Sequence, residues 1–148
     1  MHTLALTSEG HVYSWGCNDE GALGREGAEN VPILVDSALN NPVNNITAGD
    51  CHSIAYNTDN NIIYRWGSYR NAMTGPIGEK ELKPILIETK ELQNLQIKKI
   101  ASGSQHTLVL ASGRVYGWGD PETGKTGRML KSRNKNNQSL KIEAIGIK

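Results

Sequence analysis

The sequence predicts an all-β fold built from repeated, four-stranded antiparallel sheets. Trp-Gly pairs recur at Trp15, Trp66 and Trp118, roughly 51 residues apart. A histidine precedes each pair at a similar distance, and short apolar segments between them are separated by glycine-rich turns. Self-similarity at a fixed spacing indicates a repeat architecture in which each unit packs against the next.

The composition agrees with many short strands. The chain of 148 residues has no Phe, 16 glycines and only 37% hydrophobic residues, which suits short strands better than long helices. A net charge of +1 gives no general reason to expect nucleic acid or an anionic membrane as a partner. We find no membrane-spanning segment or secretory signal in the sequence, and therefore expect no membrane partner. Cys17 and Cys51 lack metal-ligand spacing and are predicted to be reduced thiols, with a disulfide as the alternative.

Hairpins are predicted immediately before the first and third Trp-Gly pairs. Apolar residues alternate over residues 4–15 around Ser8, Glu9 and Gly10, and over residues 108–118 around a Ser-Gly pair. Glycine supplies the positive φ that such tight turns require. The residues expected to face a shared core are Ile54, Tyr56, Leu108 and Leu110.

Two further strands complete each unit. Residues 31–35 (VPILV) and 83–87 (KPILI) share a proline, which belongs at a strand start or an edge because it lacks an N–H. Residues 46–49 (ITAG) and 100–103 (IASG) form the strand that precedes the hairpin. Each unit is therefore interpreted as a Pro-led strand, a second strand and a hairpin closed by Trp-Gly.

Units of this size are typical of β-propeller blades, which stack radially. We treat residues 1–148 as one partial propeller, with repeat landmarks at 2–24, 46–78 and 100–127. The chain opens within a unit and holds fewer than three, whereas closed propellers need roughly four to eight blades. The expectation is a fragment of a longer propeller.

The repeated aromatic and imidazole side chains are interpreted as structural. A catalytic base or metal ligand is the alternative, but one copy in each unit is better explained by packing, with polar atoms bonded to neighbouring groups. These residues are His2, His52, His106, Trp15, Trp66 and Trp118. We expect no metal and no cofactor.

The stretch from Gly119 to Thr126 (GDPETGKT) satisfies a phosphate-loop pattern. Both of its glycines are repeat positions, equivalent to Gly16 and Gly21. A phosphate loop also opens a helix, whereas the following residues are polar and rich in Asn. The repeat therefore explains this pattern better than nucleotide binding does.

The stretches WGCNDEGALGRE, AGDCHS and WGSYRN resemble the regulator of chromosome condensation repeat family. The resemblance covers nearly the whole chain and implies a seven-bladed propeller in the complete protein. It further implies a nuclear, chromatin-associated factor that promotes exchange of GDP for GTP on the small GTPase Ran. Such exchange is non-covalent, so no enzyme chemistry or small-molecule substrate is implied. The alternative is a propeller of the same family that serves as an interaction module in a ubiquitin ligase, kinase or trafficking regulator.

The second unit departs from the repeat after its Trp-Gly pair. Residues 66–78 (WGSYRNAMTGPIG) take thirteen residues to reach the closing glycine, where the other two units take ten. The resemblance implies that this region is a β-wedge acting at the GTPase's nucleotide site, with Tyr69, Arg70 and Asn71 as contact residues. The alternative is a longer loop without function.

Three other positions draw a role from the resemblance. It implies that Asp50 takes part in exchange, although an Asx turn is the alternative. Gln105 stands where an acid is expected, which favours the non-exchange alternative. Arg128 matches a residue implicated in Ran binding, but its equivalence to Arg25 also makes it a repeat feature.

A basic stretch follows the third unit. It holds Lys125, Arg128, Lys131, Arg133, Lys135 and Lys141 with no acid among them. The resemblance implies that Lys131, Arg133 and Lys135 contact histones, whereas a solvated loop between blades is the alternative. A histone contact of this kind would weaken steeply with salt.

Overall fold

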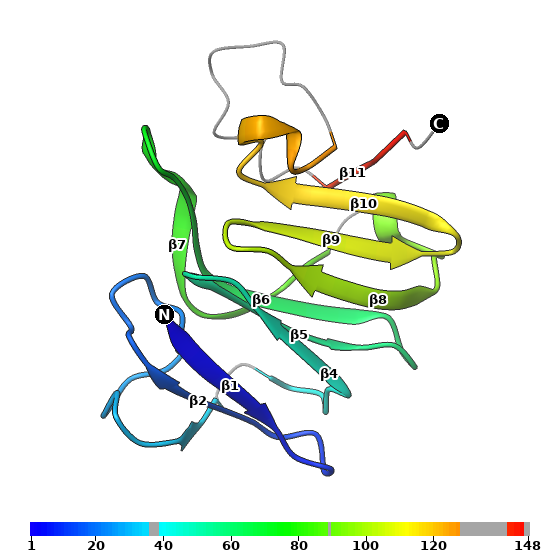
Figure 1. Cartoon of the computed structure of the whole chain (residues 1–148). Helices are drawn as coiled ribbons and strands as arrows, with labels where there is room; N and C mark the ends of the chain where they lie inside the picture. The colour runs from blue at the N-terminus through cyan, green and yellow to red at the C-terminus, as the bar shows by residue number, and fades with distance from the viewer. Residues whose placement is uncertain (36–38, 89, 128–141, 147–148) are drawn as a thin grey trace.

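Three antiparallel sheets make up the computed structural model, which describes residues 1–35, 39–88, 90–127 and 142–146 (Figure 1). The first sheet contains β1 (His2–Leu6), β2 (Val12–Gly16) and β3 (Ile33–Leu34). The second contains β4 (Asn45–Ala48), β5 (His52–Asn57), β6 (Ile62–Asn71) and β7 (Gly75–Leu86). The third contains β8 (Ile97–Ser102), β9 (His106–Ala111), β10 (Arg114–Gly119) and β11 (Glu143–Ala144). Two short 3₁₀ turns, η1 (Lys90–Leu92) and η2 (Glu122–Gly124), connect strands.

The Pro-led segments close the preceding sheet instead of opening the next one. β3 follows Pro32 and pairs with β2, while the part of β7 around Pro84 pairs with β6 at the sheet edge. This corrects the strand order predicted within a unit. After each Trp-Gly turn the chain folds back on the strand it has just left, because consecutive strands tend to lie side by side.

The hairpin between β9 and β10 has the predicted tight turn. Ser112 and Gly113 both have positive φ, 47° and 76°, as a two-residue turn of type I′ requires. Ala111 pairs with Arg114 across this turn. The turn sequence therefore sets the register of the two central strands.

Hydrophobic cores fill the two spaces between the sheets. Ile54 and Tyr56 pack with Val109 in the core between the second and third sheets. Leu108 and Leu110 are only half-buried, so the prediction that they share this core is wrong. Successive side chains of a strand point to opposite faces, and β9 uses its odd-numbered residues to face the second sheet.

Polar side chains join the sheets near the ends of their strands. His2 Nε2 lies 2.6 Å from Ser53 Oγ, joining the first sheet to the second. His52 Nε2 lies 3.2 Å from Thr107 Oγ1, joining the second sheet to the third. The same histidine of the repeat thus faces a hydroxyl on the following sheet in both places.

The indole of Trp66 packs on the loop of the first unit. Its Nε1–H donates to the carbonyl oxygen of Ala22 at 2.8 Å. Gly24 lies beneath the ring, where an added Cβ would come within 2.7 Å of Trp66 Cδ1. Trp66 and Trp118 are fully buried, whereas Trp15 of the first sheet is half-buried.

Several features of the described ranges bear on function. None of their helices has the length and apolar character needed to cross a membrane. In the same ranges, no three His, Cys, Asp or Glu side chains lie close enough together to hold a metal ion. Cys17 and Cys51 are free thiols.

Stability should fall in mild acid because of His52. Burial, aided by the neighbouring His2 and His106, lowers the pKa of His52 from 6.5 to about 3. Between these values the unfolded chain binds the proton and the folded chain does not. The free energy of unfolding should therefore fall by about 1 kcal/mol per pH unit as the pH drops below 6.5. Urea unfolding at pH 7, 6 and 5 measures this slope.

In His52→Gln, the number of protons taken up on unfolding should fall by about one, and the pH slope of the free energy of unfolding should fall accordingly. His11→Gln, at an exposed histidine, is the matched control. An unchanged slope in His52→Gln would contradict the assignment.

Gly24→Ala should destabilise the fold more than Gly113→Ala. Both glycines have positive φ, 66° and 76°, so each substitution costs about 1 kcal/mol in backbone strain. Only at Gly24 does the new methyl also collide with the Trp66 ring, because nothing lies within 4 Å at Gly113. We expect an additional loss of about 1–3 kcal/mol from overpacking, measured by urea unfolding. Equal losses in the two variants would show that the Trp66 contact is less tight.

Candidate functional site

The thirteen-residue stretch of the second unit forms a long β-hairpin. β6 continues past Trp66 to Asn71, and β7 begins at Gly75 after a three-residue turn. The corresponding strands of the other units end at Gly16 and Gly119. The additional residues therefore lengthen a strand pair, which projects beyond the rest of its sheet (Figure 1). We call residues 67–78 the projecting hairpin.

Tyr69 anchors the base of the projecting hairpin. Its side chain is 1% exposed, its hydroxyl lies 2.8 Å from Thr107 Oγ1, and its ring centroid lies 4.3 Å from that of His52. Burial raises the pKa of Tyr69 to about 12. Because the ring is enclosed between the second and third sheets, it does not offer the surface contact area expected from the sequence.

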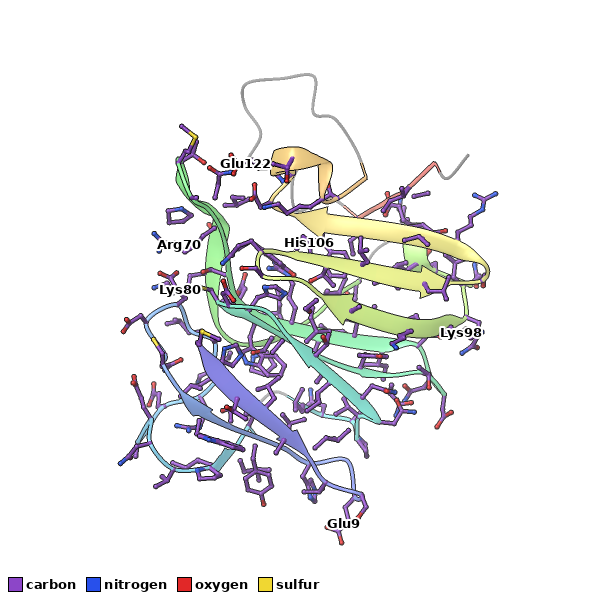
Figure 2. All side chains as sticks on the ribbon, in the orientation of Figure 1. Glu9, Arg70, Lys80, Lys98, His106 and Glu122 are labelled. Atoms are coloured by element: carbon purple, nitrogen blue, oxygen red, sulfur yellow. The ribbon has the colours of Figure 1, made fainter. Side chains whose placement is uncertain are left out.

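Arg70 lies on the outer side of the hairpin, next to Lys80 (Figure 2). Its Nη1 lies 2.5 Å from Glu20 Oε1, and its side chain remains 42% exposed. Glu20 also accepts a hydrogen bond from Ser68 Oγ at 2.7 Å. This hydrogen bond, assisted by Arg70 and Lys80, outweighs burial and lowers the pKa of Glu20. The site therefore holds an ionised carboxylate beside a partly accessible guanidinium.

Asn71 joins the hairpin to the third unit. Its Nδ2 donates to Asp120 Oδ1 and to Glu122 Oε2, both at 2.9 Å. Its Oδ1 accepts the backbone N–H groups of Met73 and Thr74, which form the turn at the tip. One side chain thus shapes the tip and attaches it to the neighbouring unit.

The turn after β10 provides the acidic side of this attachment. Asp120 is 1% exposed and accepts a hydrogen bond from Lys125 Nζ at 2.6 Å. Burial alone raises the pKa of Asp120, but hydrogen bonds from Lys125, Asn71 and the Glu122 backbone lower it overall. Lys125 is thus engaged by Asp120, and in the described part after Gly119 the only helical element is the three-residue 3₁₀ turn η2. This geometry does not match a phosphate loop.

Asp50 and Gln105 occupy neighbouring loops. Asp50 is exposed, and its carboxylate accepts a hydrogen bond from the Ser104 hydroxyl. This contact crosses between units, unlike the Asx turn considered from the sequence. Gln105 Oε1 accepts the backbone N–H of Arg70 at 2.8 Å, while its backbone carbonyl accepts the N–H of Asp120 at 2.8 Å. Gln105 therefore ties the hairpin base to the third unit.

The structure brings together Tyr69, Arg70, Asn71 and Gln105, but it does not describe all the predicted site residues. Arg128, Lys131, Arg133 and Lys135 lie outside the described residues. Sequence reasoning missed Glu20, Asp120 and Met73. Met73 lies at the hairpin tip and is 85% exposed. The repeat offered one signal for Glu20. The equivalent position in the third unit is the uncharged Thr123, so the acid at position 20 is not a feature of the repeat.

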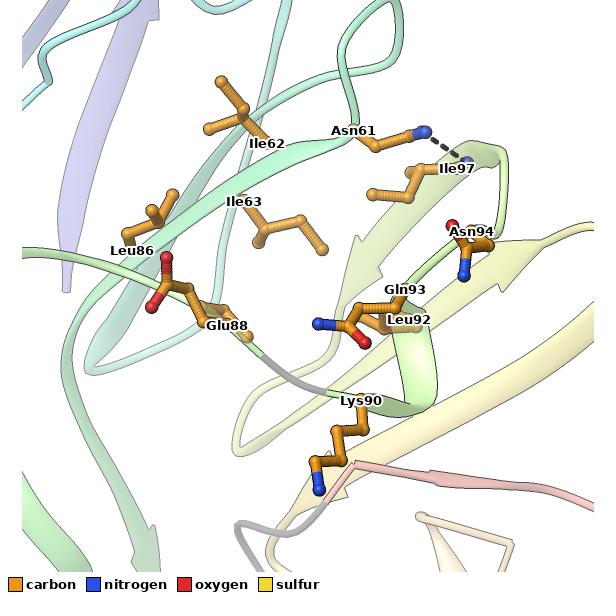
Figure 3. A pocket seen from close by; sticks show the side chains of 11 residues that line it. Asn61, Ile62, Ile63, Leu86, Glu88, Lys90, Leu92, Gln93, Asn94 and Ile97 are labelled. Carbon is orange, nitrogen blue, oxygen red and sulfur yellow. Dashed lines mark hydrogen bonds between the residues drawn. The ribbon is translucent and has the colours of Figure 1, made fainter.

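A hollow of about 480 Å³ lies at the other end of the β6–β7 ladder (Figure 3). Its walls include Ile63, Leu86 and Leu92, and one rim is fixed by a hydrogen bond from the Ile97 N–H to Asn61 Oδ1 at 3.0 Å. Apolar and amide side chains make up most of the lining, together with Glu88 and Lys90, and the described lining contains no His, Cys or Ser. The projecting hairpin is therefore the better candidate site.

Comparisons with known proteins agree on the repeat. Two profiles described as the regulator of chromosome condensation repeat match residues 9–56 and 97–124. The human protein named "Regulator of chromosome condensation" is 42% identical over 135 residues, which cover 87% of this chain and 31% of that protein. The human E3 ubiquitin-protein ligase HERC2 is 38% identical over 133 residues, covering 86% of this chain and 3% of the ligase.

A solved structure supports the fold. The crystal structure of Prp20p from Saccharomyces cerevisiae matches with a TM-score of 0.88 and 30% identity, covering 99% of this chain and 36% of that one. The chain spans about a third of the length of this structure and of the human regulator. The predicted β-propeller is confirmed, with about three blades in this chain. Agreement in both repeat sequence and sheet arrangement means that the chain belongs to the regulator of chromosome condensation repeat family.

Proposed function

We propose that this chain carries the exchange element of a guanine-nucleotide exchange factor for a Ran-type GTPase. This proposal rests on the projecting hairpin, which presents the partly exposed Arg70 and is fixed at its base by the buried Tyr69. Support comes from its similarity to the human regulator and to Prp20p, whose crystal structure was described with its binding to Gsp1p and histones.

Exchange by such an element needs no covalent step. A factor that binds the nucleotide-free GTPase more tightly than the loaded form weakens nucleotide binding by the same free energy. The hairpin inserts at the nucleotide site, where Arg70 pairs with a carboxylate of the GTPase. Asn71 shapes the tip, Tyr69 anchors the base, and Asp50 and Arg128 add contacts to the same partner.

An interaction propeller without exchange activity is the second candidate. Gln105 favours it, because a neutral amide stands where the family resemblance implies an acid. The similarity to HERC2, a ubiquitin ligase, supports it too. The complete reading frame discriminates between the two, since a linked ligase or kinase domain would favour the second candidate.

Nuclear location and chromatin association belong to the same proposal. Lys131, Arg133 and Lys135 supply the positive charge for a histone contact. The described binding of Prp20p to histones supports this assignment.

Arg70→Ala should slow GDP release from Ran. Losing one member of a hydrogen-bonded charge pair at an interface costs about 2 kcal/mol or more, so kcat/KM should fall by about thirtyfold or more. The assay follows release of fluorescent GDP, using the protein encoded by the complete reading frame that contains this chain. Asp50→Ala is measured in parallel and should also lower kcat/KM.

Arg114→Ala is the matched control, because Arg114 is an exposed arginine at the start of β10, outside the projecting hairpin. Release rates within twofold of wild type for both Arg70→Ala and Asp50→Ala would rule out these residue assignments. A wild-type protein that binds Ran without accelerating release would instead support the interaction module.

A further inference from the structure

We infer that Glu20 and Asp120, one from each neighbouring unit, are positioning residues that hold the projecting hairpin in its orientation. This inference rests on the proposed function, because it assigns the residues that keep the exchange element in place. Neither acid belongs to the hairpin itself, and neither needs to touch the GTPase in order to act.

The hairpin's own strand pairing does not fix its direction. The β6–β7 register shifts between Arg65 and Gly67, and again between Gly67 and Tyr69. Such irregularities bend a strand and increase its local twist. Above them, a two-stranded ladder is only marginally stable in water without further support. Contacts from outside the ladder are therefore needed to set its orientation.

Glu20 supplies such contacts from the first unit. Its two carboxylate oxygens bind Ser68 Oγ at 2.7 Å and Arg70 Nη1 at 2.5 Å, which are both on β6. Lys80 of β7 lies 3.9 Å from the same carboxylate and donates to the Asp19 carbonyl at 2.6 Å. β6 within the hairpin, and β7 just beyond the hairpin's base, are thus both bound to one loop of the first unit.

Asp120 supplies the opposing contact from the third unit. Its Oδ1 accepts from Asn71 Nδ2, close to the tip, at 2.9 Å. Lys125 binds the other oxygen at 2.6 Å and keeps the buried carboxylate ionised. A hydrogen bond to a charged acceptor is roughly twice as strong as a neutral one. The hairpin is therefore held from both flanks, and Glu20 also directs the guanidinium of Arg70.

Restoring double substitutions test each side separately. Glu20→Arg places a cation against Arg70 and should release the hairpin, whereas Glu20→Arg combined with Arg70→Glu restores the ion pair. Asn71→Asp places a carboxylate against Asp120 and Glu122. Adding Asp120→Asn restores the hydrogen bond between positions 71 and 120 in the opposite direction, with the amide at 120 as donor and the carboxylate at 71 as acceptor. Glu9→Gln and Asp59→Asn, both at exposed turns, are the matched controls.

The first readout is amide hydrogen exchange of residues 69–77 in the protein from the complete reading frame. Each disruptive single variant should accelerate exchange of these amides by about tenfold, since a hydrogen bond to a charged group is lost. Protection in β5 and β9 should be unchanged. The Glu20→Arg, Arg70→Glu pair should return most of the lost protection, whereas the Asn71→Asp, Asp120→Asn pair should return part of it, because Glu122 still faces a carboxylate at position 71. Unchanged exchange at residues 69–77 in both single variants would overturn the inference.

The second readout is kcat/KM for GDP release from Ran. Glu20→Arg and Asn71→Asp should each lower it by about tenfold, because a misplaced element loses catalytic geometry. The Glu20→Arg, Arg70→Glu pair should recover amide protection without recovering release, since the charge presented to the GTPase is reversed. Loosened hairpin amides with unaffected release would overturn the positioning role, provided that Arg70→Ala still slows release. If Arg70→Ala has no effect either, the proposed function fails, and the amide exchange alone decides whether the two acids hold the hairpin.

Discussion

One buried carbonyl group, that of Ala22, joins the first unit to the second. It accepts hydrogen bonds from Trp66 Nε1 and from Ser53 Oγ, both at 2.8 Å. The loop that carries Ala22 is thereby fixed against the second sheet, and Gly24 allows the indole to lie directly on it. Glu20 belongs to this loop. The packing that stacks the two sheets therefore also sets an acid beside the projecting hairpin.

Thr107 has a comparable role on the other side. Its hydroxyl lies 2.8 Å from the Tyr69 hydroxyl and 3.2 Å from His52 Nε2, so one buried group serves both sheet stacking and the hairpin base. His52 takes part as a neutral ring, because burial lowers its pKa to about 3. The orientation of the hairpin thus depends on how the three successive sheets pack. A change at the interface between the first and second sheets, or between the second and third, would alter that orientation.

The repeat register predicted the antiparallel sheets, the hairpins and the position of the additional residues, because each depends on spacing along the chain. It placed the Pro-led strands at the start of the next sheet, whereas they close the preceding one. It failed to predict which face of β9 meets the neighbouring sheet. Leu108 and Leu110 look like core residues by alternation, yet Val109 faces the second sheet. It also could not reveal that Tyr69 is enclosed. Burial of that ring depends on Thr107, 38 residues away, and no local pattern reports a contact of that kind.

Gln105 shows how a neutral residue can serve where an acid is expected. Its side chain accepts the Arg70 N–H, and its backbone carbonyl accepts the N–H of Asp120, so it aligns the hairpin with the turn that carries the buried acid. Negative charge is not lost from this side of the hairpin, because Asp120 and Glu122 both accept from Asn71. A carboxylate at position 105 would add a third negative charge near these two and raise their mutual repulsion. In this chain, an amide therefore stands at a point where the hairpin is already bound to two acids, Asp120 and Glu122.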